Sequence, residues 1–251
     1  MHIVSLSFDD GFEDSFPRVV DLYEGHGLRA CLNIVATVRG RPGFAADVEG
    51  VPELDLTNFD LWNSLAARGH EIMPHTYCHQ NLQNVSLATA EALIDRGLEL
   101  FAEHLQGYDA SRAIYNFAYN ASTPEVEALL ETRVRAWRTG GSEINPLPTA
   151  TTRRITCSAH GPGNCEEDLD RKLAEFVASE GGWFVYNLHG LDEEGWGGRH
   201  TWTTCSADCS TRERRFVRWG RRWMTLHECV ATATRVGARP HSTRSSTGDP
   251  P

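Results

Sequence analysis

The chain has 251 residues, of which 40% are hydrophobic and 23% are charged, and its formal net charge at pH 7 is −10. This composition is typical of a globular protein and excludes a mainly disordered chain, and no apolar stretch reaches the ~18 residues that a membrane-spanning helix needs. The excess of acidic residues also argues against nucleic acid as a partner, because phosphate binding requires a basic surface.

The stretch between Met1 and Asp9 alternates between apolar and polar side chains, as a β-strand does. A secretory signal peptide instead has a charged start followed by about 7–15 apolar residues. The seven cysteines are scattered without a framework pattern, which is typical of reduced thiols. We therefore expect a cytoplasmic protein.

Apolar stretches and helical patterns alternate along the first 198 residues. The apolar stretches predict strands at 3–8, 30–35, 71–74, 113–118, 135–138, 154–157 and 183–188. Apolar side chains at helical spacing predict helices over 58–68, 87–105 and 166–179, and a capping box at 122–125 predicts another helix to about residue 131. This alternation indicates a parallel sheet of βα units, either an open sheet or a barrel.

Two adjacent carboxylates, Asp9 and Asp10, follow the first predicted strand and precede Gly11. In parallel βα folds the ligand site lies at the carboxyl ends of the strands, which is where this pair falls. Both side chains can reach one site only if the backbone turns, and glycine allows that turn. The alternative is that one aspartate caps the helix that begins near Ser15 while the other is solvated.

Histidines follow two further predicted strands. His75 and His79 are four residues apart after the strand at 71–74, and two imidazoles with one carboxylate form a catalytic metal site when a water completes the coordination. His189 follows the strand at 183–188. Each motif has an ordinary alternative, chance spacing for the pair and a structural role for His189, but their convergence on one edge of the sheet favours an active site.

These segments resemble the motifs of the polysaccharide deacetylase family, which is named for the NodB chitooligosaccharide deacetylase and is also called carbohydrate esterase family 4. The matching residues are 8–11 (Phe-Asp-Asp-Gly), 69–72 (Gly-His-Glu-Ile), 75–79 (His-Thr-Tyr-Cys-His) and 188–189 (Leu-His). The resemblance covers about residues 2–197. It implies a distorted, NodB-like (β/α) barrel of about seven parallel strands.

The resemblance also implies roles for the matching side chains. Asp10, His75 and His79 would bind a divalent metal, Zn²⁺ in our interpretation, with Co²⁺ and Ni²⁺ as alternatives. Asp9 would be the general base and His189 the general acid. The implied reaction is hydrolysis of an N-acetyl group on an amino sugar or a glycosylated small molecule, with release of acetate. The alternatives are an amidase of the same fold that acts on a linear or cyclic non-sugar amide, and a non-catalytic sugar-binding relative.

The chain departs from the family pattern in the third and fourth motifs. The family sequence Pro-Tyr-Gly, whose tyrosine amide helps to hold the oxyanion, corresponds to residues 118–120 (Ala-Tyr-Asn), so Tyr119 is expected to supply that amide. The arginine that contacts the base aspartate is expected at Arg112, one position from the family spacing. Only residues 135–138 (Arg-Ala-Trp-Arg) correspond to the fourth motif.

Residues 198–251 differ in character from the catalytic region at 2–197. Residues 199–251 contain ten arginines and four acidic residues, a net charge of +6, whereas residues 1–198 carry a net charge of −16. The Ser-, Thr-, Gly- and Pro-rich tail at 237–251 is expected to be disordered. Two interpretations of the segment remain: a sequence whose reading frame diverges near Gly198, and a basic element that covers the bottom of the barrel or binds a partner.

Overall fold

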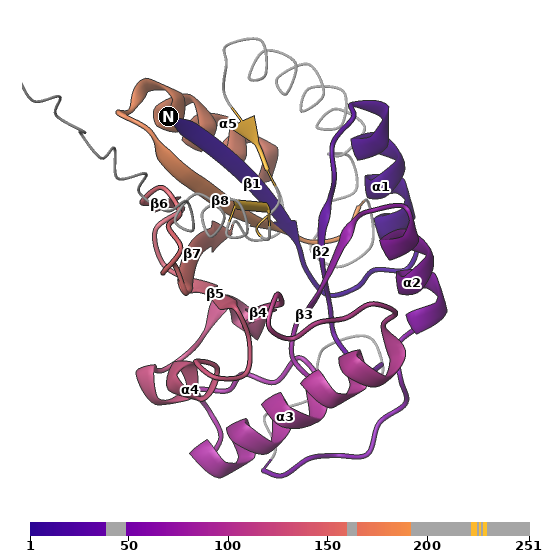
Figure 1. Cartoon of the computed structure of the whole chain (residues 1–251). Helices are drawn as coiled ribbons and strands as arrows, with labels where there is room; N and C mark the ends of the chain where they lie inside the picture. Colours follow the sequence, from indigo (N-terminus) through magenta and orange to yellow (C-terminus); the bar gives the residue numbers. More distant parts are fainter. Residues whose placement is uncertain (39–48, 160–164, 192–221, 225, 227, 230–251) are drawn as a thin grey trace, which may run out of the picture.

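Seven parallel strands form the main sheet of the computed structural model, which describes residues 1–38, 49–159, 165–191, 222–224, 226 and 228–229. The strands are β1 (His2–Phe8), β2 (Cys31–Ile34), β3 (Glu71–Pro74), β4 (Ile114–Asn116), β5 (Ala136–Gly140), β7 (Arg154–Ala159) and β8 (Gly182–Leu188). They lie in the order β3-β2-β1-β8-β7-β5-β4, with β1 and β8 side by side (Figure 1). The sheet curves into a nearly closed barrel, which confirms the α/β barrel of about seven parallel strands.

The two edge strands, β3 and β4, meet at the seam of this barrel. No backbone ladder joins these two strands, both of which the structure describes in full. Pro74 ends β3 and has no N–H to donate, which suits an edge strand. Side chains span the seam instead: Asn116 Nδ2 donates to Pro74 O at 3.3 Å, and Ile114 N donates to Met73 Sδ at 3.4 Å.

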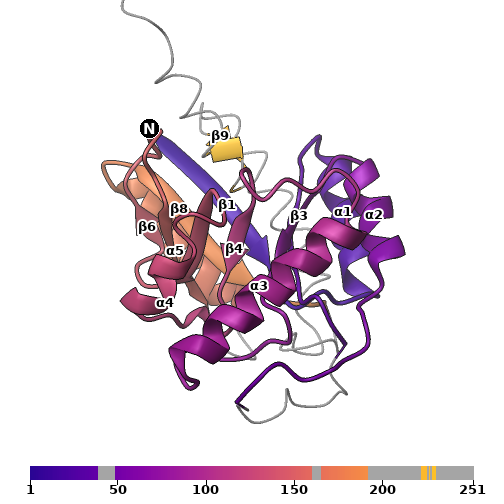
Figure 2. The same ribbon diagram turned by 60° about the horizontal axis from the view of Figure 1, so that its bottom comes forward.

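Helices surround the strands on the outside (Figure 1; Figure 2). They are α1 (Ser15–Gly25), α2 (Phe59–Ala67), α3 (Leu87–His104), α4 (Pro124–Leu129) and α5 (Cys165–Ala178), with a short 3₁₀ turn, η1 (Ala118–Asn120), after β4. The cap of α4 is Thr123, whose side chain accepts the N–H of Val126, and not the first residue of the expected capping box. None of the described helices is long and apolar enough to cross a membrane.

The inner face of β1 is polar from Ser5 onward. Trp183 Nε1 donates to Ser5 Oγ at 2.9 Å, and Asn33 Nδ2 donates to Ser7 Oγ at 2.6 Å. Because side chains alternate along a strand, the residue that continues this inner row is Asp9. The carboxylate of Asp9 therefore lies next to the hydrogen-bonded side chains in the interior of the barrel.

A short strand from the C-terminal part of the chain, β9 (Arg222–Trp223), pairs in parallel with β1 at Ile3 and Val4. The strand β2 pairs with β1 only near its carboxyl end, so β9 occupies the edge of β1 that β2 leaves open. Leu226 and Cys229, which follow β9, are buried in the hydrophobic core.

The remaining strand, β6 (Ile144–Asn145), pairs antiparallel with β8. Neither β6 nor β9 was expected, because a two-residue strand carries no periodicity from which to predict it. The expected disordered tail at 237–251, like most of the basic segment at 198–251, lies outside the described residues.

We expect a chain that ends at Gly198 to be less stable than the full chain, because it lacks β9 and the buried Leu226. The loss in the free energy of unfolding should be about 3 kcal/mol or more, the cost of emptying one large buried site. Urea denaturation measures this difference. A chain that ends at residue 236 keeps β9 and is the matched control. Equal urea midpoints for all three chains would show that the segment after Gly198 does not stabilise the barrel.

Candidate active site

The two carboxylates reach one site because the backbone turns directly after β1. The N–H of Asp9 still donates to Leu188 O at 2.9 Å, as in a continuing strand. Asp10 and Gly11 then adopt φ values of 81° and 71°. This left-handed turn brings the side chain of Asp10 to the same side as that of Asp9. Gly11 therefore adopts the left-handed conformation that the sequence predicted for the turn, and Asp10 adopts it as well.

The histidine pair lies in a tight loop after β3 and not on a helix. The side chain of Thr76 accepts the N–H of His79 at 2.8 Å, and both residues have positive φ values, 69° and 55°. Nδ1 of His75 donates to the backbone carbonyl of Asn116 on β4 at 3.0 Å. This bond fixes the imidazole so that the lone pair of Nε2 faces the carboxylates, as in a histidine that binds a metal.

Three ligand atoms from these two segments converge. Asp10 Oδ1 lies 3.2 Å from His75 Nε2 and 3.1 Å from His79 Nε2. Ligand atoms bound tetrahedrally at about 2.0–2.1 Å lie about 3.3 Å apart, so the spacing suits Zn²⁺. Among the described residues, this is the one group of His, Cys, Asp and Glu whose ligand atoms all lie within 4.8 Å of one another.

Two of these atoms have no hydrogen-bond partner among the described residues, although both are buried: Asp10 Oδ1 and His75 Nε2. Buried polar atoms rarely lack a partner, and a bound cation would satisfy both. Burial by itself raises the pKa of Asp10, but the imidazoles of His75 and His79 outweigh it and hold the pKa well below the ordinary value of 3.8. The carboxylate is therefore ionised and available to a cation.

Asp9 is held by a fully buried arginine on the opposite wall of the barrel. Arg138 Nη2 donates to Asp9 Oδ2 at 2.6 Å, and Asn33 Nδ2 donates to Asp9 Oδ1 at 2.6 Å. Burial raises the pKa of Asp9, but Arg138 and His75 outweigh it, so the pKa lies below its ordinary value. Oδ2 also lies 3.6 Å from His75 Nε2, which places Asp9 directly beside the three converging ligand atoms.

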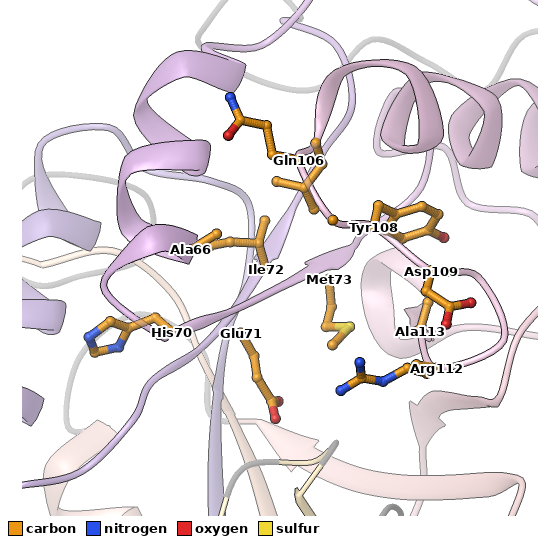
Figure 3. A pocket seen from close by; sticks show the side chains of 13 residues that line it. Ala66, His70, Glu71, Ile72, Met73, Gln106, Tyr108, Asp109, Arg112 and Ala113 are labelled. Atoms are coloured by element: carbon orange, nitrogen blue, oxygen red, sulfur yellow. The ribbon is translucent and has the colours of Figure 1, made fainter.

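The expectation that Arg112 contacts the base aspartate is wrong, because Arg138 makes that contact. Arg112 precedes β4, so it lies near the amino end of its strand, whereas Asp9 follows the carboxyl end of β1. Arg112 lines a second pocket, which has a volume of about 320 Å³. Figure 3 shows its side chain there together with those of Glu71 and Met73. The predicted strand at 135–138 has an arginine at each end, and the sequence does not indicate that Arg138 is the one that enters the barrel.

The active-site pocket has a volume of about 220 Å³. It is lined by Asp9, Asp10, His75, His79, Tyr119, Asn120, Ala159, Asn187 and His189. The structure thus brings together all six expected site residues, and adds Asn120, Ala159 and Asn187 to them. Tyr119 is half-exposed at the mouth, with its ring centroid 4.6 Å from that of His79. His189 is partly buried.

Backbone strain is concentrated around this pocket. Every described non-glycine residue with positive φ lies in or beside it: Asp10, Thr76, His79, Tyr119 and Asn120. Such conformations cost free energy and are typical of functional sites. Asn120 occupies the position of the family glycine, and asparagine is among the residues that tolerate the left-handed region best. An asparagine at this position therefore suits the left-handed turn of this loop.

Comparisons with solved structures identify the same fold. The Xyl-CE4 domain of a multidomain xylanase from the hindgut metagenome of Trinervitermes trinervoides matches with a TM-score of 0.59 and 13% identity, over 95% of this chain and 93% of that one. The family 4 acetyl xylan esterase from Clostridium thermocellum, in complex with a cobalt ion, matches with a TM-score of 0.57 and 15% identity, over 92% and 91%.

Two further matches differ in activity. The Bc1960 peptidoglycan N-acetylglucosamine deacetylase has a TM-score of 0.58 and 16% identity, over 91% of this chain and 87% of that one. A CE4 family pseudoenzyme from Bacillus anthracis has a TM-score of 0.56 and 9% identity, over 92% and 66%. At these identities the likeness shows the fold alone.

The sequence comparisons decide the family. A search of curated proteins found no match. The family model described as polysaccharide deacetylase matches residues 1–131, which is more than half of the chain and includes Asp9, Asp10, His75 and His79. The chain therefore belongs to the polysaccharide deacetylase family.

Proposed function

We propose that the protein is a metal-dependent deacetylase that hydrolyses the N-acetyl group of an amino sugar or a glycosylated small molecule and releases acetate. One observation carries the proposal: Asp10, His75 and His79 converge in a pocket that also contains Asp9 and His189. Membership of the family supports deacetylation as the reaction. The match to an N-acetylglucosamine deacetylase supports an amide as the bond that is cleaved.

Asp10, His75 and His79 would hold the metal. Two imidazoles and one carboxylate are a donor set typical of catalytic zinc sites, which keep one position open. A bound Zn²⁺, with Co²⁺ or Ni²⁺ as alternatives, supplies a Lewis acid for the acetyl carbonyl and lowers the pKa of a coordinated water from 15.7 to about 7. The bond from His75 Nδ1 to the carbonyl of Asn116 keeps the other ring nitrogen directed at this position.

Asp9 would act as the general base that accepts a proton from the attacking water. Its pKa is lowered by Arg138 and His75 against the effect of burial, so the carboxylate is ionised at neutral pH. Arg138 and Asn33 each bond one carboxylate oxygen, and these two bonds fix the orientation of the base. A positioned general base contributes about 10²–10⁴-fold to the rate.

His189 would protonate the nitrogen of the leaving amine. An amide requires this step, because an amine anion is a very poor leaving group. The backbone N–H of Tyr119 would donate to the oxygen on which negative charge develops as water attacks. The left-handed backbone at Tyr119 and Asn120 shapes the loop that presents this group to the pocket.

Two rival functions make different predictions. An amidase of the same fold would cleave a linear or cyclic non-sugar amide, because a fold does not fix the substrate. A panel of acetylated sugars and non-sugar amides separates this rival from the proposal. A non-catalytic sugar-binding relative would neither bind the metal nor release acetate, and a CE4 family pseudoenzyme is among the matched structures.

We expect Asp9→Asn and His75→Ala to impair acetate release for different reasons. Asp9→Asn removes the base and should lower kcat by about 10²–10⁴-fold while the protein keeps its metal. His75→Ala removes a ligand and should lose both the metal and the activity. Acetate release and metal content, measured on the same preparations, test both expectations.

The matched control for these variants is His26→Ala, because His26 lies outside the pocket. It should keep the metal and the wild-type rate. Wild-type acetate release by either Asp9→Asn or His75→Ala would overturn the proposed mechanism.

We expect Arg138→Gln to impair both stability and catalysis. It leaves the buried carboxylate of Asp9 without its cation, and breaking a buried pair in this way costs about 3–5 kcal/mol of the free energy of unfolding. The rate should fall by about 10²-fold, the lower end of the loss for a missing base, without loss of metal. Arg112→Gln is the matched control and should change neither value. If Arg112→Gln were the more damaging variant, the assignment of Arg138 would be wrong.

A further inference from the structure

Asn187 is a buried active-site residue that the mechanism above does not use. It lies on β8, two residues before His189, and lines the active-site pocket. The residue is 4% exposed, and its Oδ1 has no hydrogen-bond partner among the described residues. A buried carbonyl oxygen without a partner costs free energy, so it indicates a group that is supplied by a ligand.

The side chains of other buried asparagines in the barrel make hydrogen bonds within the protein. Asn33 donates to Ser7 and Asp9, and Asn145 accepts the N–H of Thr156 at 2.9 Å. Asn116 also has an unpaired Oδ1, but it does not line the pocket, and its Nδ2 donates to two backbone carbonyls. Asn187 alone among these four combines an unpaired Oδ1 with a place in the pocket wall.

The register of the sheet places Asn187 on the floor of the pocket. It pairs with Ser7 of β1 on one side and with Ala159 of β7 on the other. It therefore lies one level deeper than Asp9 and His189, which are nearer the carboxyl ends of their strands. His189 protonates the leaving nitrogen in the proposed reaction, so the bulk of the substrate lies at the mouth. The floor is left for the substituent on the acyl carbon.

The amide of Asn187 makes one side of this floor polar, beside the methyl side chain of Ala159. Every residue that lines the pocket has a polar side chain except Ala159. The methyl group of an acetyl substrate would lie against the amide of Asn187 and leave it unpaired. A hydroxyl in the same place could donate to Oδ1 and accept from Nδ2, which would satisfy both ends of the amide.

We propose that Asn187 recognises a hydroxyl on the acyl group, so that the site prefers an N-glycolyl (hydroxyacetyl) group to an N-acetyl group. The inference rests on the proposed function and narrows its substrate class. Water attacks the acyl carbon, the C–N bond breaks, and glycolate leaves with the oxygen of the water. Asp9 takes the proton of the water, and the nitrogen takes a proton from His189, so no other reactant is required.

The first test compares N-glycolylglucosamine with N-acetylglucosamine as substrates of the wild type and of Asn187→Leu. The wild type should prefer the glycolyl substrate by about tenfold in kcat/KM, which one buried hydrogen bond supplies. Asn187→Leu should lose this preference, because leucine has a similar size but no polar atom. An unchanged ratio of the two kcat/KM values in the variant would overturn the proposal.

A second test does not depend on the sugar. Calorimetry measures the binding of glycolate and of acetate to the zinc-loaded wild type and to Asn187→Leu. The ratio of the two dissociation constants should shift towards acetate by about tenfold in the variant. If neither sugar is hydrolysed, the proposed function fails, but this ratio still tests the role of Asn187. The same ratio in both proteins would refute that role.

The folding of the variant is itself informative. Because Oδ1 of Asn187 makes no bond in the protein, Asn187→Leu should not lower the Tm. Asn33→Leu is the matched control and should lower it, since Asn33 bonds both Ser7 and Asp9. If a leucine side chain does not fit at the floor of the pocket, Asn187→Ala can be used to measure the same ratio of kcat/KM values and the same ratio of dissociation constants.

Discussion

Two adjacent carboxylates buried at the end of β1 impose the constraint to which the rest of the site responds. A buried charge is strongly unfavourable unless an opposite charge and hydrogen bonds compensate it. Arg138 reaches Asp9 from β5, across the interior of the barrel, and Asn33 reaches it from β2. Asp10 faces the two imidazoles of the loop after β3. Groups on β2, on β5 and in the loop after β3 therefore surround the two negative charges that follow β1.

Much of this site could be predicted from the sequence, because parallel strands direct their carboxyl ends to one edge. The strand at 71–74 has the expected bounds, and the groups that follow it and the strands at 3–8 and 183–188 do line one pocket. The same rule could have excluded Arg112, which precedes its strand. The partner of Arg138 could not be predicted, since Asp9 lies 129 residues away and no local pattern records a contact across a barrel.

The remaining features could not be predicted from the sequence, for other physical reasons. The strands β6 and β9 have two residues each, too few to show a period. The unpaired oxygen of Asn187 depends on which side chains surround it, and a polar residue inside an apolar strand does not indicate whether its partner is protein or ligand. The loop at Tyr119 and Asn120 makes a left-handed turn without a glycine, which a motif that departs from Pro-Tyr-Gly did not predict.

The seam between β3 and β4 has a consequence for how the barrel and its ion depend on each other. The imidazole of His75 belongs to the loop after β3, but its orientation is set by a carbonyl on β4. Any separation of these two edge strands would rotate the ring and draw one ligand away from the other two. Release of the cation and separation of β3 from β4 would then be coupled, and a bound ion would stabilise the contact between these two edge strands.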